Sequence, residues 1–226
     1  MGLFCELIAP GDEVVEVGAH IGYIAVLYSE LVGPRGRVIV FEPGPNNLPY
    51  LRQNIATCRN VTLLEYAVSD FSGEASFFIE NYTGQNNSLL SGYGRFDENL
   101  KNAGLSKDVA KSVINVRCVT LDEMSAKGVL GSPSLVKVDV EGAEFAVVKG
   151  MVELLGRCNV CLMVEVTENC EEVFAFLRAQ GYRGFSADRT PITGGVAATL
   201  NTFWLKPADP RLARFLGGAD QAAVVA

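Results

Sequence analysis

Two acidic residues follow a buried strand of this chain at a spacing that suits chemistry at a hydroxyl group. The apolar run 134–139 ends in Asp139, and Glu141 follows two positions later. Residues two apart in an extended segment face the same side, so both carboxylates could approach one ligand. A hydroxyl is a poor nucleophile at neutral pH, and a carboxylate base or a metal ion beside it would promote attack by its oxygen. Alternatively, Asp139, Glu141 and Glu144 serve the following helix as N-terminal acids.

A glycine turn after the first predicted strand is typical of a nucleotide-type cofactor site. The apolar residues 13–18 lead into a turn that carries Gly18 and Gly22. Glycine leaves no Cβ between the backbone and a ligand. A helix over residues 21–32 would direct its N-terminal amides at a carboxylate or a phosphate. The sequence therefore predicts a cofactor at the carboxyl end of this strand.

The spacing of the glycines indicates which cofactor the turn suits. A dinucleotide fingerprint, G-x-G-x-x-G, would need glycine at positions 18, 20 and 23, where this chain has Gly18, His20 and Tyr23. That mismatch argues against NAD and FAD. Together with Glu16, the glycines form acid-x-Gly-x-x-x-Gly, which is similar to the E/D-x-G-x-G-x-G turn of S-adenosylmethionine enzymes. We expect His20 to shape the turn rather than to act as a base.

A second strand-end acid indicates a ribose. The β-branched run 37–42 ends in Glu42, which Pro43 follows. A carboxylate at this place can accept hydrogen bonds from both ribose hydroxyls. An NAD enzyme would also place an acid here, so Glu42 indicates a ribose and not one particular cofactor. A charged strand end on the surface, without a role, is the alternative.

Strand-like and helix-like runs alternate along most of the chain, which predicts an α/β fold with a doubly wound parallel sheet. Gly and Pro clusters separate the runs, as at residues 33–36 and 43–45. The expected strands are 13–18, 37–42, 61–66, 134–139, 159–166, 182–187 and 200–206, and the expected helices are 21–32, 45–57, 142–155 and 168–180.

An insert of about residues 71–125 interrupts the alternation. Residues 75–80 and 114–119 are predicted to pair as strands, and the polar stretch 82–111 between them is rich in Asn, Gly and Ser. We interpret the insert as a lid that selects the substrate. A mobile surface loop is the alternative for the polar stretch.

Length and charge limit the function further. The 226 residues fit one domain, residues 1–206, followed by a tail, residues 207–226, whose apolar side chains at helical spacing predict packing on the domain or fraying. A formal net charge of −7 without a basic cluster argues against binding to nucleic acid or an anionic membrane. No apolar run reaches the roughly 20 residues that span a bilayer, and no signal segment leads the chain, so we expect a cytoplasmic protein.

The cysteine and histidine content excludes several kinds of site. The six cysteines fall mostly in or beside predicted strands and helices, as expected of reduced core residues. Cys158 and Cys161 have no second Cys or His pair to complete a zinc set. His20 is the only histidine, which excludes a His-based metal site and a Ser-His-Asp triad.

Four segments, in their order and spacing, resemble the FkbM family of S-adenosylmethionine-dependent methyltransferases. They are residues 16–22, 40–43, 67–70 and 136–144, and the last carries the specific pattern Lys-x-Asp-x-Glu-Gly-x-Glu. The resemblance spans roughly residues 11–187. It implies the Rossmann-like class I methyltransferase sheet of seven strands, the last antiparallel, with the insert between the third and fourth core strands. It also implies O-methylation of a sugar, glycolipid, polysaccharide or polyketide-type product.

In that strand order Glu165 lies on the strand beside Asp139. Asp139 is the first candidate for the base and Glu141 the second, while Glu165 could share a proton, position the acceptor or help to hold a divalent ion. Two carboxylates are few for a metal site, so we do not predict one. Alignment of acceptor oxygen, methyl carbon and sulfur could by itself supply most of the catalysis. Lys137 should point to the side of Asp139, where it binds substrate or simply neutralises that acid.

The expected cofactor contacts are Glu16, Gly18, Ala19, His20, Gly22, Glu42, Pro43, Ser69, Asp70 and Asp139. Ser69 and Asp70 follow the third strand, where a polar group could meet the exocyclic amine of adenine. Asp70 could instead cap the turn 71–73. In the insert, Asn87 and Ser88 could bind a polyhydroxylated acceptor, although a solvated loop explains them nearly as well.

Three classes of function compete. An O-methyltransferase that acts on a small or glycosylated hydroxyl acceptor is favoured. A cofactor-binding module that has lost catalysis and serves a biosynthetic assembly is disfavoured by the retained acids Asp139, Glu141 and Glu165. An NAD-linked oxidoreductase conflicts with the glycine spacing.

Overall fold

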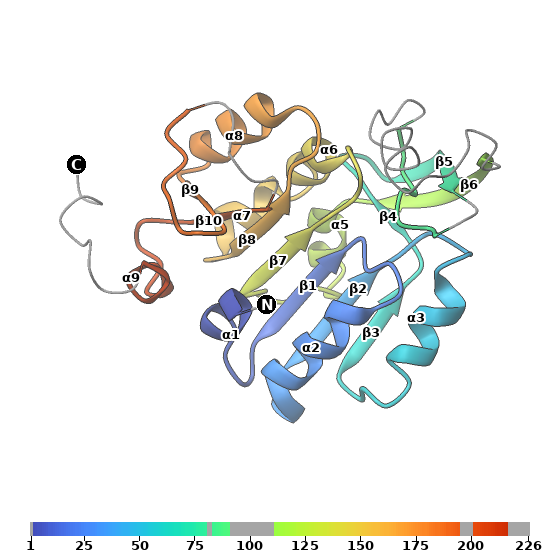
Figure 1. Cartoon of the computed structure of the whole chain (residues 1–226), viewed down its shortest axis with the longest axis horizontal. Helices are drawn as coiled ribbons and strands as arrows, with labels where there is room; N and C mark the ends of the chain where they lie inside the picture. Colours follow the sequence, from blue (N-terminus) through green and yellow to red (C-terminus); the bar gives the residue numbers. More distant parts are fainter. Residues whose placement is uncertain (1, 81–82, 91–110, 195–200, 217–226) are drawn as a thin grey trace.

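A seven-stranded mixed sheet forms the centre of the protein (Figure 1), whose computed structural model describes residues 2–80, 83–90, 111–194 and 201–216. Its strands are β1 (Glu13–Val17), β2 (Arg37–Phe41), β3 (Val61–Leu64), β7 (Leu135–Val138), β8 (Cys161–Glu165), β9 (Arg183–Ser186) and β10 (Asn201–Leu205). They lie in the order β3-β2-β1-β7-β8-β10-β9. The first five pair in parallel, whereas β10 runs antiparallel to β8 and β9. The predicted fold class, with its antiparallel last strand, is confirmed.

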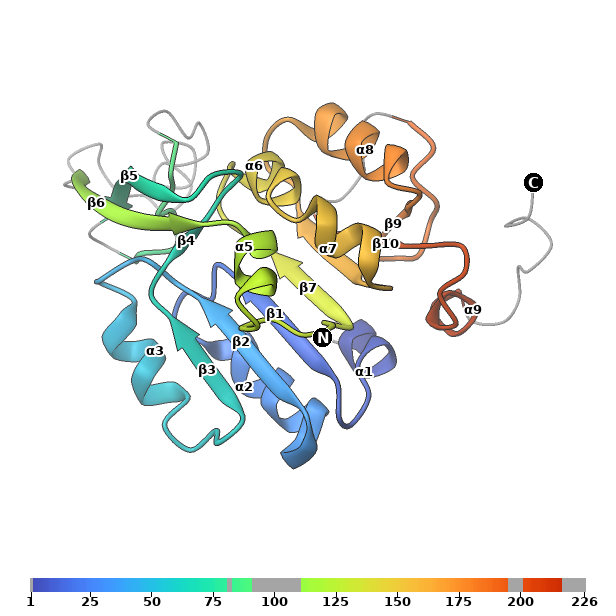
Figure 2. The ribbon, with the colours of Figure 1, turned by 180° about the vertical axis from the view of Figure 1, so that it is seen from behind.

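Helices cover both faces of this sheet (Figures 1 and 2). One face carries α1 (Gly2–Leu7), α2 (Tyr23–Val32), α3 (Leu48–Asn54) and α9 (Arg211–Phe215). The other carries α5 (Leu121–Ala126), α6 (Glu144–Lys149), α7 (Val152–Arg157) and α8 (Cys170–Ala179). Among the described residues, no helix has the length and apolar character needed to cross a membrane.

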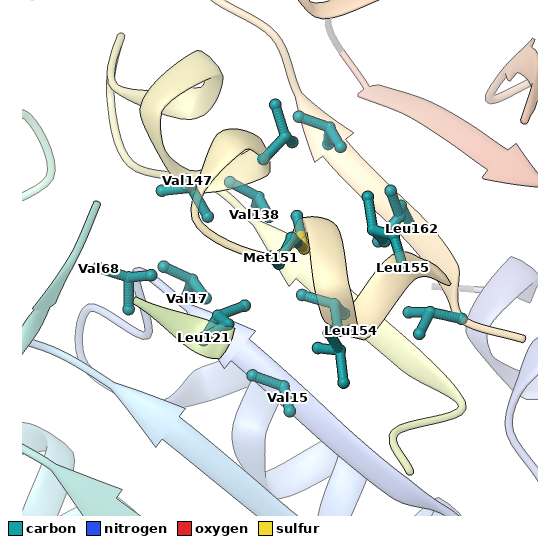
Figure 3. Close-up of a cluster of buried hydrophobic side chains, with 14 of the residues drawn as sticks. Val15, Val17, Val68, Leu121, Val138, Val147, Met151, Leu154, Leu155 and Leu162 are labelled. Carbon is teal, nitrogen blue, oxygen red and sulfur yellow. The ribbon is translucent and has the colours of Figure 1, made fainter. Parts of the chain in front are cut away.

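The side-chain alternation of the strands produces two separate cores. Val15 and Val17 of β1 face α5, α6 and α7, where Met151, Leu154 and their neighbours are buried (Figure 3). Val14 points to the opposite face and packs with α1, α2 and α3. Because residues 14 and 16 share a face, the acidic Glu16 lies on the α2 side of the sheet.

The insert forms a second sheet at the carboxyl ends of the parallel strands (Figure 1). Its strands are β4 (Ala67–Val68), β5 (Gly73–Glu80) and β6 (Lys111–Val119), in the order β4-β6-β5. β5 and β6 pair antiparallel from Gly73↔Cys118 to Glu80↔Lys111, which confirms the predicted pairing. Of the predicted lid, residues 81–82 and 91–110 lie outside the described residues.

Three features of the helices differ from the prediction. Helix α5 lies in the predicted insert, where no helix was expected. Helix α1 precedes β1, where no helix was predicted, and it buries Phe4 and Leu7 against the α2 side of the sheet. The single helix predicted over residues 142–155 is two, α6 and α7, with a break at Gly150. A Cβ at Gly150 would lie 2.1 Å from the carbonyl oxygen of Ser69, so the approach of the β4 turn leaves room only for glycine there.

The described part of the tail, residues 207–216, packs on the domain through α9 (Arg211–Phe215), which is one of the two predicted alternatives. Residues 217–226 lie outside the described residues. Leu212 and Phe215 are buried on the α1 side of the sheet. Arg189 donates from Nη1 to the carbonyl of Phe215 at 2.7 Å and pairs through Nη2 with Glu6 of α1 at 2.7 Å. The six cysteines are free, and burial raises the pKa of Cys161, inside β8, to about 12.

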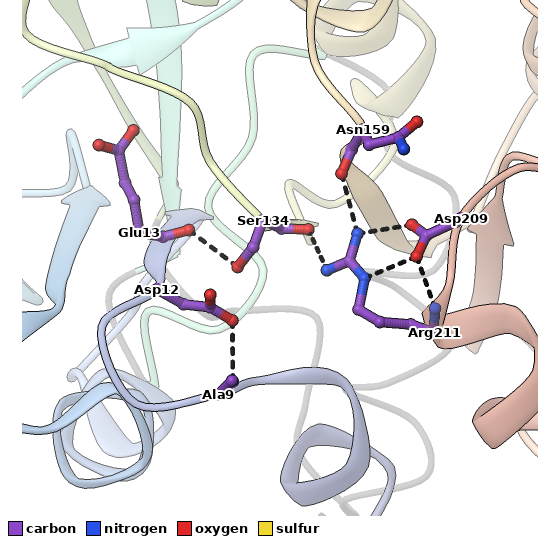
Figure 4. A network of polar contacts seen from close by, with 7 residues as sticks. All are labelled: Ala9, Asp12, Glu13, Ser134, Asn159, Asp209 and Arg211. Atoms are coloured by element: carbon purple, nitrogen blue, oxygen red, sulfur yellow. Dashed lines mark hydrogen bonds and ion pairs between the residues drawn. The ribbon is translucent and has the colours of Figure 1, made fainter.

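Arg211 clamps the start of α9 to the amino ends of β7 and β8 (Figure 4). Its guanidinium donates to the carbonyls of Ser134 at 2.6 Å and Asn159 at 2.9 Å. It also forms a two-point pair with Asp209, at 2.9 and 2.6 Å, and the Asp209 side chain is only 1% exposed. One side chain therefore satisfies two strand-end carbonyls and a buried carboxylate.

We expect Arg211→Met to destabilise the fold by about 3 kcal/mol, because it leaves the carboxylate of Asp209 buried without its cation. Urea unfolding measures this free energy. The matched control is Arg52→Met, which breaks the exposed Arg52–Glu65 pair and should cost about 1 kcal/mol or less. Equal losses in the two variants would show that the clamp does not stabilise the fold.

Candidate functional site

A cavity of about 250 Å³ lies where the parallel strands end. Open α/β sheets bind ligands at this edge. Seven of the predicted site residues line the cavity at or just after the ends of β1, β2, β7 and β8. They are Gly18, His20, Glu42, Pro43, Asp139, Glu141 and Glu165. The insert supplies the remaining walls: apolar side chains from the β4 and β5 region and polar ones from residues 84–87. The structure thus brings the predicted cofactor turns and the predicted acids to one cavity.

The absent side chains of the glycines in the first turn leave room for neighbouring protein, and Gly18 also lines the cavity. A Cβ at Gly18 would lie 1.8 Å from the carbonyl oxygen of Asp139, and φ at Gly18 is +84°. A Cβ at Gly22 would lie 2.3 Å from Leu51 of α3. Helix α2 starts at Tyr23, two residues later than predicted. Gly18 therefore allows the turn after β1 to lie against the end of β7.

His20 shapes this turn, as predicted. It has a left-handed backbone with φ +50°, and its amide donates to Glu42 Oε2 at 2.8 Å. Its ring Nε2 lies 3.2 Å from the carbonyl of Thr83 in the insert. The residue therefore links the turn after β1 both to the end of β2 and to the insert.

Glu42 is a buried hydrogen-bond acceptor, not the exposed strand end that the alternative interpretation described. It is 4% exposed. Oε1 accepts from the amide of Gly44 at 2.8 Å and from Nδ2 of Asn47 at 3.1 Å, and Oε2 accepts from His20. A carboxylate accepts about four hydrogen bonds, so three donors leave about one position for a ribose hydroxyl. Burial raises the pKa of Glu42 to about 7, against the effect of these donors.

Residues 83–90, which we call the strap, join the insert to the turn after β2. Asn47 donates to the carbonyl of Gly84 at 3.1 Å. Asn46 donates to the carbonyl of Glu80 at 3.0 Å and accepts from Nδ2 of Asn87 at 2.9 Å. The strap therefore forms a wall of the cavity next to Glu42. Sequence reasoning missed Asn46 and Asn47, although asparagine directly before a helix is a signal for local side-chain bonding.

The strap also contacts the acidic turn after β7. The hydroxyl of Ser88 donates to the carbonyl of Glu141 at 2.7 Å and accepts from the amide of Leu90 at 3.0 Å. Ser88 is 1% exposed and does not line the cavity, whereas Asn87 lines it. A solvated loop is therefore the wrong description of both residues. Their predicted contact with an acceptor stays a prediction for Asn87, while Ser88 fixes the acidic turn.

The three predicted acids reach the cavity by different routes. Asp139 follows β7 and Glu165 ends β8, and the register Val138↔Val164 sets these positions side by side. Glu141 has φ +53°, so the chain is not extended there and the predicted two-residue alternation is wrong. The left-handed backbone at Glu141 turns the chain. Glu141 still lines the cavity.

Lys137 and Glu16 lie beneath the cavity and do not line it. Lys137 is 6% exposed and donates from Nζ to Asp139 Oδ2 at 2.9 Å. The same nitrogen lies 3.7 Å from Oε1 of Glu16, which is 1% exposed. Lys137 is therefore a counter-ion to Asp139, as the alternative interpretation has it, and does not face the cavity. Glu16 contacts Lys137 and does not line the cavity either.

Ser69, Asp70, Ala19 and Gly22 are not part of the cavity wall. Asp70 pairs with Lys149 of α6 at 2.5 Å, and this hydrogen bond lowers the pKa of its carboxyl group. The cavity wall near β4 instead consists of Tyr66, Ala67 and Val68. Asp70 is thus directed toward α6 and does not face the cavity. The cavity wall near β4 that could face a base is apolar.

Glu144 serves the first turn of α6, as the alternative interpretation predicted. Its Oε1 accepts from the amide of Gly142 at 2.8 Å, and Thr167 lies 3.3 Å from both oxygens. Burial raises the pKa of Glu144 to about 7. Because α6 begins at Glu144, Asp139 lies outside the helix and does not cap it. Among the described residues, no group of three or more His, Cys, Asp and Glu is arranged to hold a metal ion.

The part of the chain that builds this site matches a known protein family. The model of the methyltransferase FkbM domain matches residues 16–183. The chain belongs to the FkbM methyltransferase family. The matched region includes the glycine turn, Glu42 and the three acids that line the cavity, so the family assignment rests on the part of the chain that builds the site.

Two characterised methyltransferases are similar in sequence. Hexuronic acid methyltransferase AglP of Haloferax volcanii is 26% identical over 162 residues, which are 71% of this chain and 59% of that protein. The 2-O-methyltransferase NoeI of Sinorhizobium fredii is 29% identical over 152 residues, 66% of this chain and 60% of that protein. The chain thus spans about 60% of the length of these relatives.

Solved structures share the fold. The crystal structure of methyltransferase FkbM from Methylobacillus flagellatus superposes with a TM-score of 0.53 at 13% identity, over 89% of this chain and 49% of that one. A putative rRNA methylase from Clostridium thermocellum gives a TM-score of 0.51 at 11% identity, over 90% of this chain and 89% of that one. At these identities the likeness concerns the arrangement of strands and helices alone.

The close approach at Gly18 predicts the effect of an added methyl group. We expect Gly18→Ala to reduce the free energy of unfolding, measured in urea, by at least about 2 kcal/mol more than Gly128→Ala does. Gly128 has a similar left-handed φ of +73° but nothing within 4 Å of a Cβ, so its variant pays only backbone strain of about 1–2 kcal/mol. If the two variants lose the same stability, the contact with Asp139 imposes no constraint.

Proposed function

We propose that this family member is an S-adenosylmethionine-dependent O-methyltransferase that acts on a hydroxyl of a sugar, glycolipid or polyketide-type natural product. The observation that carries the proposal is that the acids Asp139, Glu141 and Glu165 line the same cavity as the glycine turn and Glu42. The names of AglP and NoeI, a hexuronic acid methyltransferase and a 2-O-methyltransferase, support a sugar acceptor.

The residues around the cavity fit S-adenosylmethionine. Glu42 has about one free acceptor position for a ribose hydroxyl, and the side chains of Tyr66, Val68, Phe77 and Leu89 provide an apolar wall for a planar base. The carboxylates of Asp139 and Glu165 lie on the same edge as the turn and suit a positively charged ligand. When bound, this cofactor supplies an electrophilic methyl group on a sulfonium.

The chain's own contribution to the reaction is alignment and proton removal. The strap, β4 and β5 line the cavity beside the strand ends, and a cofactor and acceptor that fill it would displace water from the reacting atoms. Alignment of the acceptor oxygen with the methyl carbon supplies most of the rate. Asp139 accepts the proton as the oxygen–carbon bond forms, and Glu165, beside it on β8, orients the acceptor hydroxyl. Glu141 is the second candidate for the base.

Cofactor binding tests the first half of this proposal. We expect calorimetry to show that S-adenosylmethionine and S-adenosylhomocysteine bind and NAD does not. Glu42→Gln should weaken binding about 10- to 100-fold, because a hydrogen bond to a charged acceptor is lost. Since ribose hydroxyls donate to the ionised carboxylate, whose pKa in the protein is about 7, binding should also be tighter at pH 8 than at pH 6.

The control for this titration is Glu30→Gln, which changes an exposed glutamate of α2 and should leave the affinity unchanged. Far-UV circular dichroism of each variant establishes that it is folded. Tight binding of NAD without binding of S-adenosylmethionine would overturn the cofactor assignment.

Methyl transfer tests the second half. With a panel of methyl glycosides and hydroxylated polyketides as acceptors, Asp139→Asn should lower kcat about 10²- to 10⁴-fold, because it removes the proton acceptor. Mass spectrometry detects the methylated product. An unchanged kcat in Asp139→Asn would remove Asp139 as the base. Binding of S-adenosylmethionine without transfer to any acceptor would favour the non-catalytic partner module.

A further inference from the structure

A buried lysine lies between the acid of the glycine turn and the acid of the β7 end. Lys137 and Glu16 are partners in the parallel register of β7 and β1, and both side chains face the α2 side of the sheet. Nζ of Lys137 is 2.9 Å from Oδ2 of Asp139 and 3.7 Å from Oε1 of Glu16. The Asp139 side chain is 26% exposed, against 8% for Lys137 and 2% for Glu16. The three groups thus form a line from the core to the cavity.

Within the described part of the chain, the other ionisable groups around Asp139 are acidic or neutral. The ionisable groups that interact with Asp139 are Lys137 on β7, Glu16 on β1, Tyr28 on α2 and Glu144 at the start of α6. Glu165 on β8 interacts with Lys137, and Glu141 in the turn after β7 interacts with Glu144. Lys137 is the one cation in that set. Each of the neighbouring carboxylates would repel a negative charge on Asp139, and the ammonium group offsets that repulsion.

The lysine stays charged because it serves more than one acid. Burial lowers the pKa of Lys137, but Asp139 and Glu16, assisted by Glu165, outweigh burial and raise it above its usual value. Burial raises the pKa of Glu16 to about 7. The positive charge of Lys137 lowers this pKa, and the negative charge of Asp139 raises it further. Glu16 Oε2 is buried without a hydrogen-bond partner, so the ammonium group is what compensates this carboxylate.

We propose that Lys137 is a positioning residue, a counter-ion shared by Asp139 and Glu16, which holds the carboxylate of Asp139 aimed into the cavity while Glu16 fixes the ammonium group from beneath. This inference rests on the proposed function, in which Asp139 is the base. The inference also gives a role to Glu16, the acid of the glycine turn. Glu16 acts on Asp139 through Lys137 and does not contact the cofactor. The turn after β1 and the end of β7 are thereby joined by charge as well as by the contact at Gly18.

The titration of Glu16 reports the shared lysine without any need for an acceptor. With glutamate labelled by ¹³C at its side-chain carboxyl carbon, NMR follows Glu16 in the full chain, and Glu16→Gln assigns the signal. In Lys137→Met the midpoint of Glu16 should rise by about one pH unit or more from about 7, because its cation is gone. In Asp139→Asn the midpoint should fall by a similar amount, because a repelling charge disappears and Lys137 turns fully to Glu16.

The two variants act on Glu16 in opposite directions, so a general loosening of the core cannot produce both shifts. Lys127→Met, which breaks the exposed pair Lys127–Glu123 on α5, should leave the midpoint unchanged. If Lys137→Met does not fold, Asp139→Asn and the charge-preserving Lys137→Arg carry the test. A Glu16 midpoint that stays at the wild-type value in Asp139→Asn would overturn the shared counter-ion.

The pH profile of methyl transfer separates positioning from a purely structural role. In Lys137→Met the acidic limb of kcat/KM should move to higher pH by about one unit, with activity recovering as the pH rises, and Lys137→Arg should restore part of the wild-type profile. A loss of equal size at every pH would overturn the positioning role. If the wild-type protein methylates no acceptor, the proposed function fails, while the Glu16 titration still decides whether Lys137 is shared.

Discussion

The contact between the backbone of Gly18 and the carbonyl of Asp139 is the constraint on which the site depends. Parallel pairing of β1 and β7 places the ends of these strands side by side, and a Cβ at Gly18 would lie 1.8 Å from that carbonyl. Only glycine tolerates both this distance and a φ of +84°. The glycine turn and the turn that carries the acids are therefore held as one unit, and each fixes the position of the other.

Hydrogen bonds from the insert extend this unit to the rest of the cavity. The strap contacts the turn after β1 through His20, the turn after β2 through Asn47, and the turn after β7 through Glu141. In each contact a side chain pairs with a backbone carbonyl of another segment, so the side chains of His20, Asn47 and Ser88 fix the path of the chain. A single segment in this way links three separate turns at the edge of the sheet.

Charge is distributed unevenly over this edge. Burial raises the pKa values of Glu16, Glu42 and Glu144 to about 7, and each of them bonds or pairs within the protein. The acids that line the cavity after β7 and β8 lie further from the core. The buried acids organise the backbone, and the shallower acids line the cavity. This arrangement suits an enzyme whose ligand carries a positive charge that disappears on reaction.

The strand order follows from the family pattern in the sequence. Local periodicity also places α2 and α8 near their observed ends, and positions at strand ends identify Glu42, Asp139 and Glu165. Tertiary structure decided what each residue touches. An added Cβ at Gly18 or Gly22 would meet protein, Lys137 and Glu16 lie beneath the cavity, Asp70 pairs with Lys149, and Ser88 holds the turn of Glu141. None of these contacts joins neighbours in the chain, except that of Lys137 with Asp139. Their partners are set by strand register and by the return of the insert over the sheet edge, which local sequence spacing does not encode.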